Sequence, residues 1–268
     1  SVIENGAYAG KTLREYLEAE GGSVLGKNGA KFTDFPILTK LIDARDNLSI
    51  QVHPDNAYAQ KYENQYGKTE MWYIMDAAPD AFLYFGFEHE IGREEFERRI
   101  REDDLLPVLH QAPVHKGDVF FIEAGTLHAI GKNILLAEIQ QNSNVTYRVY
   151  DYGRVGKDGK RRELHIEKAL DVTNCRRAED THCYPHVASC PYFTVDHLVL
   201  DGKTMKKICG EVGEDSFLSI LFLSGEGEIS CAQESFSYRK GESYFLPAGS
   251  GSFAIEGECD ALITTLPE

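Results

Sequence analysis

Three short stretches of the sequence place histidine, glutamate and glutamine at spacings that suit a metal site. If residues 48–54 form a strand, Ser49, Gln51 and His53 point to one face and the apolar side chains between them point to the other. Polar side chains that are buried together need partners, and a metal ion with its ligands would supply them. The stretch therefore predicts polar groups aimed into the interior of a β structure.

Two further stretches complete the candidate metal shell. Lys68 and Glu70 share one face at the same spacing of two, and His128 follows a Gly-Thr turn where a strand restarts. Glu70 and His128 join Gln51 and His53 to offer two imidazole nitrogens and two oxygens. Mixed nitrogen and oxygen ligation without thiolate suits zinc, iron, manganese or nickel, and the residues alone leave that choice open. An amide oxygen is a weak donor, so we expect water or substrate to share the coordination sphere.

Charged residues on later strands add chemistry to the same interior. Glu138 shares a face with Leu136 and Gln140, opposite an apolar face, and a further strand carries Arg148. This parity predicts that Glu138 and Arg148 face inward, although most charged side chains face solvent. The other polar clusters are interpreted as structural or exposed: His89, His110, His115, His165, His197, the irregular group of His182, Cys183 and His186, and the charges of residues 91–110.

The elements that must position these residues are mostly strands. Short apolar runs broken by turn residues predict strands over residues 35–44, 48–53, 71–75, 81–87, 119–122, 134–139 and 145–150. Helical spacing predicts helices over residues 11–20 and 163–172, and a helical insertion over residues 91–112. Residues 152–162 and 175–191 are interpreted as a loop and a connecting segment, followed by a second all-β stretch over residues 192–266.

An internal echo suggests that one β unit occurs twice. Residues 117–128 resemble residues 241–252 without a gap: turn glycine, acid, strand, Ala-Gly turn and next strand. We therefore expect two copies of one small β-barrel. His128 in the first copy aligns with Ser252 in the second, so the metal chemistry is expected in the first copy alone.

Composition bounds the class of protein. The chain has 268 residues, room for one or two domains, and a net charge of -15 that argues against a nucleic-acid partner. An anionic substrate would need a local cationic pocket, because the overall field repels it. No apolar run is long enough for a membrane-spanning helix, and no signal segment is seen at the N-terminus. Six cysteines without a C-x-x-C pair predict reduced thiols and a cytoplasmic location. The oligomeric state is not readable.

Four ordered motifs resemble a known family. They are LSIQVHPD at residues 48–55, GKTEMWY at 67–73, AGTLHA at 124–129 and EIQQNSNVTYRVYDYGR at 138–154. Over nearly its whole length the chain resembles the short bacterial form of type I mannose-6-phosphate isomerase, a cupin-fold zinc enzyme. The resemblance implies a mainly β protein of two cupin-type jelly-roll barrels with a helical insertion. It implies a catalytic metal-binding domain over residues 1–160 and a connecting segment with a degenerate cupin over residues 161–268.

The resemblance also implies roles for individual residues. The family's zinc ligands, one ion per chain with another divalent metal as an alternative, fall on Gln51, His53, Glu70 and His128. Its catalytic residues fall on Arg148, Glu138 and Lys68, and its substrate-binding residues on Ser49 and Lys40. Family members carry an upstream segment with a Trp-Gly-Gly motif, so either the full protein is longer or this form lacks one flank of the barrel.

The implied reaction interconverts mannose 6-phosphate and fructose 6-phosphate through an enediol. Glu138 is slightly favoured as the base, while a metal-bound water or a lysine are alternatives, and Glu138 could instead orient Arg148. The expected partner is a small sugar phosphate, with neither nucleic acid nor membrane. Two competing classes are a non-catalytic sugar-binding cupin and an iron-dependent cupin oxygenase, the latter disfavoured because a fourth protein ligand fills a position that oxygen needs.

Overall fold

The computed structural model describes residues 1–156, 159–179 and 183–268. The chain is mainly β, as the sequence predicts, and it divides into two compact units. The central unit comprises residues 37–181, and the terminal unit comprises residues 1–36 and 182–268. All the residues predicted to form the site belong to the central unit. None of the helices in the described residues is long and apolar enough to span a membrane.

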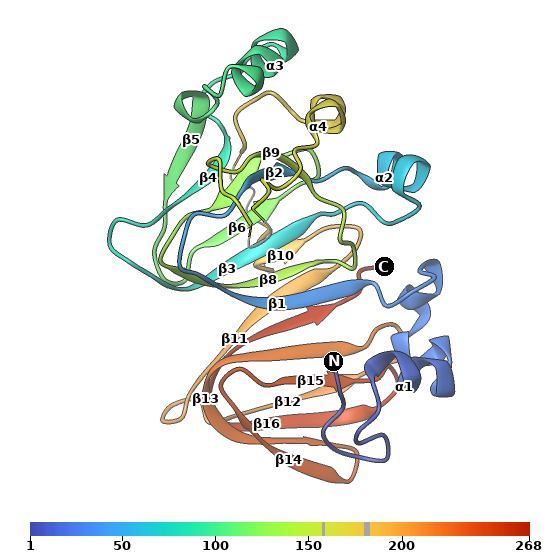
Figure 1. Ribbon diagram of the computed structural model, residues 1–268. Coiled ribbons are helices and arrows are strands. Elements are labelled where there is room, and N and C mark those ends of the chain that lie inside the picture. The colour runs from blue at the N-terminus through green and yellow to red at the C-terminus, as the bar shows by residue number, and fades with distance from the viewer. Residues whose placement is uncertain (157–158, 180–182) are drawn as a thin grey trace. The chain divides into compact units, whose positions relative to one another are not determined.

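Two antiparallel sheets form the central unit (Figure 1). The four-stranded sheet has the order β1-β8-β3-β6, with β1 at Ile37–Ala44, β3 at Glu70–Ala77, β6 at Val119–Ile122 and β8 at Ile134–Gln141. The five-stranded sheet has the order β5-β4-β7-β2-β9, with β2 at Ile50–Val52, β4 at Phe82–Phe87, β5 at Leu109–Pro113, β7 at His128–Ile130 and β9 at Tyr147–Tyr150.

An apolar core joins these two sheets. Trp72, Ile74 and Leu136 from the four-stranded sheet pack in one cluster with Leu83 and Ile130 from the five-stranded sheet. Side chains alternate along a strand, so the inward rows that hold this core continue to polar positions farther along the same strands. The core therefore fills one part of the interior and leaves the remainder to polar groups.

Helices cover the outer side of the five-stranded sheet. α3 (Arg93–Arg101) and α4 (Ile166–Val172) share an apolar cluster with β2, β4, β7 and β9, and Figure 1 shows both at the same end of the central unit. α2 (Asn56–Glu63), which the sequence did not predict, is capped by Asp55, whose carboxylate accepts from the Tyr58 amide at 2.8 Å.

The predicted insertion over residues 91–112 is only partly helical. α3 ends at Arg101, Asp103 takes a left-handed conformation with φ of 60°, and a short 3-10 turn, η3 (Leu106–Val108), follows. Pro107 disfavours a helical conformation at the residue before it and cannot donate to a helix. The chain then becomes strand β5, paired with β4, so the expectation of helix over the last residues of the insertion is wrong.

The terminal unit holds one seven-stranded sheet. Its order is β10-β11-β16-β13-β14, with β12 also paired to β16 and β15 to β13. The elements are α1 (Leu13–Glu20), η1 (Gly22–Leu25), η2 (Lys27–Lys31), β10 (Ala188–Ser189), β11 (Thr194–Asp201), β12 (Lys207–Val212), β13 (Leu218–Cys231), β14 (Glu234–Arg239), β15 (Ser243–Leu246) and β16 (Gly251–Thr265). No closed barrel is found among the described residues of either unit, so the two-barrel form stays a prediction.

The internal echo has a structural counterpart. A turn with an Ala-Gly pair joins β6 to β7, and a turn with the same pair joins β15 to β16. Gly117 and Gly241 have φ values of 93° and 88°, and Gly125 and Gly249 have values of 89° and 77°. L side chains rarely adopt these angles, which explains why glycine recurs at both positions in both copies.

Candidate metal centre and substrate pocket

Each of the two facing sheets of the central unit supplies part of the candidate site. The four-stranded sheet carries Lys40 on β1, Glu70 at the start of β3 with Lys68 just before it, and Glu138 on β8. The five-stranded sheet carries Gln51 on β2 between Ser49 and His53, His128 at the start of β7, and Arg148 on β9. Strand pairing sets Gln51 opposite His128 on one side and Arg148 on the other.

Three buried side chains meet at the centre of the site. His53, Glu70 and His128 are at most 1% exposed, and their ligand atoms lie within 4.8 Å of one another. His128 Nε2 lies 3.3 Å from Glu70 Oε1, and His53 Nε2 lies 3.7 Å from Glu70 Oε2. Two donors at about 2.0–2.2 Å from one tetrahedral zinc ion lie roughly 3.3–3.6 Å apart, which is close to both of these spacings.

Backbone carbonyls fix the orientation of both imidazole rings. His53 Nδ1 lies 2.8 Å from the Val145 carbonyl oxygen, and His128 Nδ1 lies 2.8 Å from that of Thr126. A carbonyl oxygen can only accept, so each Nδ1 carries the proton and each Nε2 keeps its lone pair toward Glu70. This arrangement is the one that metal-binding histidines commonly show.

Two polar atoms of the triad lack a hydrogen-bond partner. Among the described residues, Glu70 Oε1 and His128 Nε2 are buried without one, while Glu70 Oε2 lies 2.7 Å from Lys68 Nζ. Buried polar atoms without a partner are rare in folded proteins because desolvation without compensation is costly. A divalent cation would satisfy both unpartnered atoms, so the residues fit a metal ion. Gln51 lies directly opposite His128 in the pairing of β2 with β7. The Cβ atoms of residues paired in this way lie roughly 5 Å apart, so the Gln51 side chain begins close to that of His128.

Burial sets the protonation of the triad. Burial, reinforced by the charge of Glu138, raises the pKa of Glu70 to about 7. Burial also lowers the pKa of His128 to about 4 and the pKa of His53 well below its usual value, the latter with help from Lys68. Both histidines are therefore neutral near pH 7, as metal ligands must be, and a bound cation would favour the ionised form of Glu70.

Two lysines flank the acidic groups. Lys68 Nζ lies 2.7 Å from Glu70 Oε2 and 3.1 Å from His53 Nε2, while Lys40 Nζ donates to Glu138 Oε1 at 2.7 Å. The other oxygen of Glu138 accepts from Trp72 Nε1 at 3.1 Å. Burial alone would raise the pKa of Glu138, but Lys68 and Lys40 outweigh it and the pKa is lowered. Glu138 is therefore a carboxylate at neutral pH.

The Arg148 guanidinium is held by neutral groups. Its Nε donates to Ser49 Oγ at 3.2 Å, and its Nη1 donates to the Glu163 carbonyl oxygen at 3.0 Å. Within the described ranges no carboxylate lies at ion-pair distance from Arg148, and Glu138 pairs with Lys40 instead. The hypothesis that Glu138 orients Arg148 is not supported by this geometry. The arginine charge stays available to an anion.

Sequence reasoning found Gln140 on the inward face but gave it no role. Its side chain is fully buried; Oε1 accepts from Lys40 at 2.5 Å, and Nε2 donates to the Gln141 and Ser143 carbonyl oxygens at 2.6 and 2.8 Å. The parity that placed Glu138 was the available signal for this residue. Gln140 therefore connects the lysine of the pocket to the loop after β8.

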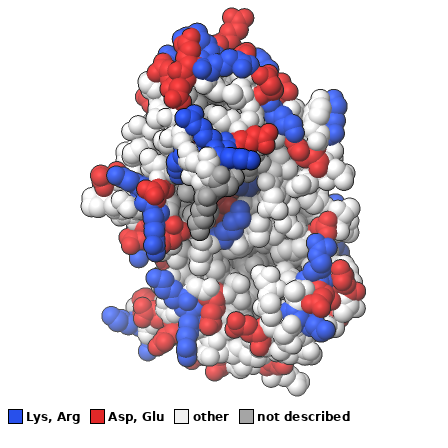
Figure 2. Space-filling view, in the orientation of Figure 1, with Lys and Arg blue, Asp and Glu red and all other residues white. Residues whose placement is uncertain are grey.

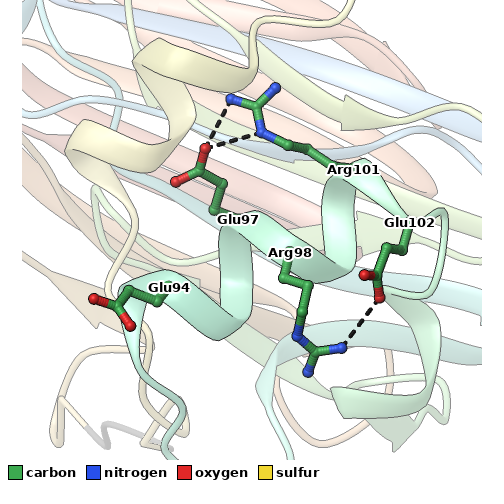
Figure 3. A pocket seen from close by; sticks show the side chains of 5 residues that line it. All are labelled: Glu94, Glu97, Arg98, Arg101 and Glu102. Carbon is green, nitrogen blue, oxygen red and sulfur yellow. Dashed lines mark hydrogen bonds and ion pairs between the residues drawn. The ribbon is translucent and has the colours of Figure 1, made fainter.

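Among the residues that the structure describes, the other polar groups do not form a comparable site. His182 lies outside the described residues, and His186 pairs with Asp196 at 2.7 Å. On the face shown in Figure 2, acidic and basic side chains are interspersed. A shallow depression on α3 is lined by Glu94, Glu97, Arg98, Arg101 and Glu102, none of which is buried. Figure 3 shows Glu97 paired with Arg101 and Arg98 paired with Glu102 along the helix.

The fold and the site define a mainly β protein with a buried His-Glu-His centre able to hold a divalent metal beside lysine and arginine side chains. Comparisons with known proteins then give the family. Residues 1–83 match the family described as "Phosphomannose isomerase type I, catalytic domain", and residues 184–266 match "Mannose-6-phosphate isomerase, cupin domain". The chain belongs to the type I mannose-6-phosphate isomerase family.

Similar proteins cover almost the whole chain. Mannose-6-phosphate isomerase ManA of Bacillus subtilis is 36% identical over 277 residues, which span 99% of this chain and 85% of that protein. The mannose-6-phosphate isomerase of Streptococcus mutans is 38% identical over 98% of this chain and 83% of its own length. The crystal structure of the mannose 6-phosphate isomerase from Bacillus subtilis superposes with a TM-score of 0.88 at 33% identity, covering 98% of this chain and 85% of that chain.

Proposed function

We propose that this chain interconverts mannose 6-phosphate and fructose 6-phosphate with one zinc ion. The observation that carries the proposal is the buried triad of His53, Glu70 and His128, whose two ring orientations are fixed by backbone carbonyls and in which Glu70 Oε1 and His128 Nε2 have no hydrogen-bond partner among the described residues. Relatives at 36% and 38% identity are named mannose-6-phosphate isomerases, which supports this activity rather than a non-catalytic sugar-binding role.

The metal would be held by Gln51, His53, Glu70 and His128. Two imidazole nitrogens and two oxygens suit zinc, although other first-row divalent ions accept the same donors. When bound, the ion would act as a Lewis acid toward the sugar oxygens at C1 and C2, where charge develops. The amide of Gln51 is the weakest of the four donors and leaves the ion electrophilic.

Glu138 is proposed as the base that moves the proton. In the forward direction its carboxylate takes the proton from C2 while O1 takes a proton from a water molecule, which gives the enediol. The same carboxyl group then returns the proton to C1 while the O2 hydroxyl gives its proton to the hydroxide left by that water, which leaves the ketone at C2. The lowered pKa of Glu138 keeps it unprotonated before the first step, and Lys40 and Trp72 hold its two oxygens in place.

Cationic side chains are proposed to bind and orient the sugar phosphate. Arg148, steadied by Ser49, has no carboxylate partner among the described residues, and Lys68 and Lys40 add positive charge nearby. A chain of net charge -15 repels a phosphorylated substrate overall, so attraction must come from such a local group. Arg148 would also stabilise negative charge on the enediol oxygens, with planar donors in a partly buried setting.

We also propose the domain organisation and the location of the protein. A catalytic cupin domain within residues 1–160 and a degenerate cupin within residues 161–268 are supported by the cupin match over residues 184–266. A cytoplasmic location is supported by Cys175, Cys190, Cys209, Cys231 and Cys259, which form no disulfide bond in the structure.

The test compares turnover with solvent exchange. Purified protein should convert mannose 6-phosphate to fructose 6-phosphate, and the wild type should exchange the transferred hydrogen with deuterium from the solvent. Glu138→Gln removes the basic oxygen with little change of shape, so both rates should fall together; Glu256→Gln, at an exposed carboxylate of the terminal unit, should change neither. Near-normal exchange in Glu138→Gln would rule out Glu138 as the base, and no isomerase activity in the metal-loaded wild type would overturn the function itself.

A further inference from the structure

The loop between β8 and β9 supplies a partner for a proposed metal ligand although it has no regular secondary structure. Within residues 142–146, the Val145 carbonyl oxygen accepts from His53 Nδ1 at 2.8 Å, and Val145 is only 6% exposed. The orientation of the His53 ring therefore depends on where this loop holds one peptide group. Strand pairing cannot fix that position, because β9 begins only at Tyr147.

The hydroxyl of Ser143 holds this peptide group. Ser143 is 3% exposed; its Oγ accepts from the Val145 amide at 3.2 Å and donates to the Tyr66 carbonyl oxygen at 2.7 Å. Tyr66 lies two residues before Lys68 on the segment that leads into β3. One hydroxyl thus links the Val145 peptide group, which orients His53, to the segment that carries Lys68 and Glu70.

The two glutamines at the end of β8 hold the backbone of Ser143, Gln140 through its side chain and Gln141 through its carbonyl oxygen. Gln140 Nε2 donates to the Ser143 carbonyl oxygen at 2.8 Å, while its Oε1 accepts from Lys40. The Ser143 amide donates to the Gln141 carbonyl oxygen at 2.7 Å, and Gln141 Oε1 accepts from the Thr69 amide at 2.9 Å, immediately before Glu70. The backbone of Ser143 is therefore held on both sides, and its hydroxyl is aimed at the Val145 amide.

We propose that Ser143 is a positioning residue for metal binding: its hydroxyl fixes the Val145 carbonyl, so that His53 presents Nε2 to the ion. The inference rests on the proposed metal centre and goes beyond it, because Ser143 touches neither the ion nor the sugar. Loss of a group that orients a metal ligand usually weakens metal affinity about 10–100-fold. We expect a loss of that size when the hydroxyl is removed, without loss of the fold.

A matched serine in the terminal unit provides the control. Ser216 Oγ also donates to a carbonyl oxygen, that of Phe217 at 2.8 Å, and also accepts from a backbone amide, that of Leu266 at 2.8 Å. Ser216→Ala therefore removes a hydroxyl with the same two hydrogen bonds, but far from the metal ligands in the sequence and in the other unit. It should lower the unfolding midpoint without altering metal affinity.

The experiment measures the zinc dissociation constant of metal-stripped protein by competition with a chromophoric chelator, together with the unfolding midpoint of the stripped protein. Ser143→Ala should raise the constant about 10–100-fold, while Ser216→Ala should leave it at the wild-type value. Wild-type zinc affinity in folded Ser143→Ala would overturn the inference. If that variant does not fold, Ser143→Cys, whose thiol is a weaker donor and acceptor, decides in its place: weaker zinc binding supports the inference and wild-type binding overturns it. A wild type that binds no zinc would instead overturn the metal centre on which the proposed function depends.

Discussion

The four-stranded sheet of the central unit and four strands of the terminal unit are built on one plan. The order β1-β8-β3-β6 in the first corresponds to β11-β16-β13-β15 in the second, and all pairs are antiparallel. β3 has an irregularity between Ile74 and Asp76 in its pairing with β8, and β13 has one between Phe222 and Ser224 in its pairing with β16. The repeat therefore extends from the hairpin seen in the sequence to a whole ladder and its bulge.

Backbone hydrogen bonds at the hairpin confirm this correspondence. The Gly117 amide donates to the Ile74 carbonyl at 2.8 Å, as the Gly241 amide donates to that of Phe222 at 2.8 Å. The Ile74 and Phe222 amides donate in turn to the residues after these glycines, at 2.9 and 3.0 Å. Ile74 and Phe222 are therefore equivalent positions in the two units.

Side chains, not backbone, separate the two copies. The register places Leu218 where the first copy has Glu70, Ile263 where it has Glu138, and Asp196 where it has Lys40. The hairpin alignment adds Ser252 in place of His128. At these positions the second copy has the partly buried Leu218 and Ile263 and the more exposed Asp196 and Ser252, so the ladder forms without the buried polar network of the first copy. Chemistry is the better explanation for the presence of that network.

The largest expected effect is confined to the first copy. Removal of metal with a chelator should lower isomerase turnover by on the order of 1,000-fold or more, since Lewis-acid stabilisation of developing charge contributes several kcal/mol. Re-addition of zinc should restore the rate, as measured in a coupled assay. Full activity in protein shown to be metal-free by elemental analysis would contradict the assignment.

The second-largest effect is expected from removal of the Arg148 guanidinium, which has no carboxylate partner among the described residues. Arg148→Ala should reduce turnover by about 100- to 1,000-fold, the scale of a lost charge-stabilising donor. Arg98→Ala, on the exposed face of α3, serves as the matched arginine control and should leave steady-state turnover unchanged. Ordinary turnover in Arg148→Ala would remove this residue from the mechanism.

A substitution in the second copy should alter stability alone. Phe222 is fully buried and stacks on Tyr238 with ring centroids 3.8 Å apart. Phe222→Ala leaves a cavity and should destabilise the protein by about 3–5 kcal/mol in urea unfolding. At temperatures where the variant is folded, its turnover and zinc content should match the wild type; a loss of zinc would mean that the two copies are not chemically separate.

The smallest effect is expected on the surface of α3. Arg98 and Glu102 pair at 3.1 Å with side chains 52% and 57% exposed (Figure 3). Solvent and salt screen such pairs, so Arg98→Ala should leave the urea midpoint within experimental error. A clear shift of that midpoint would show that α3 contributes to stability through more than its buried face.

The sequence predicted which side chains of the site are buried better than it predicted the elements and backbone groups that position them. Alternation along strands was enough to predict that the side chains of His53, Glu70 and Glu138 are buried, because a buried face imposes parity on polar residues, while the inward direction of Gln51 stays a prediction. The groups that orient these side chains could not be read in the same way. The carbonyls of Val145 and Thr126 belong to irregular backbone, whose path no side-chain pattern encodes. α2 and β5 were missed for a related reason, since short amphipathic segments near proline give no stable period.

The central claim is that side chains from two facing sheets converge on one divalent ion. A crystal structure of the zinc-loaded protein, with anomalous data at the zinc edge, tests it most directly. We predict one anomalous peak per chain in the central unit, about 2.0–2.2 Å from donor atoms of Gln51, His53, Glu70 and His128. A peak elsewhere, or an ion that leaves His53, Glu70 or His128 uncoordinated, would contradict it.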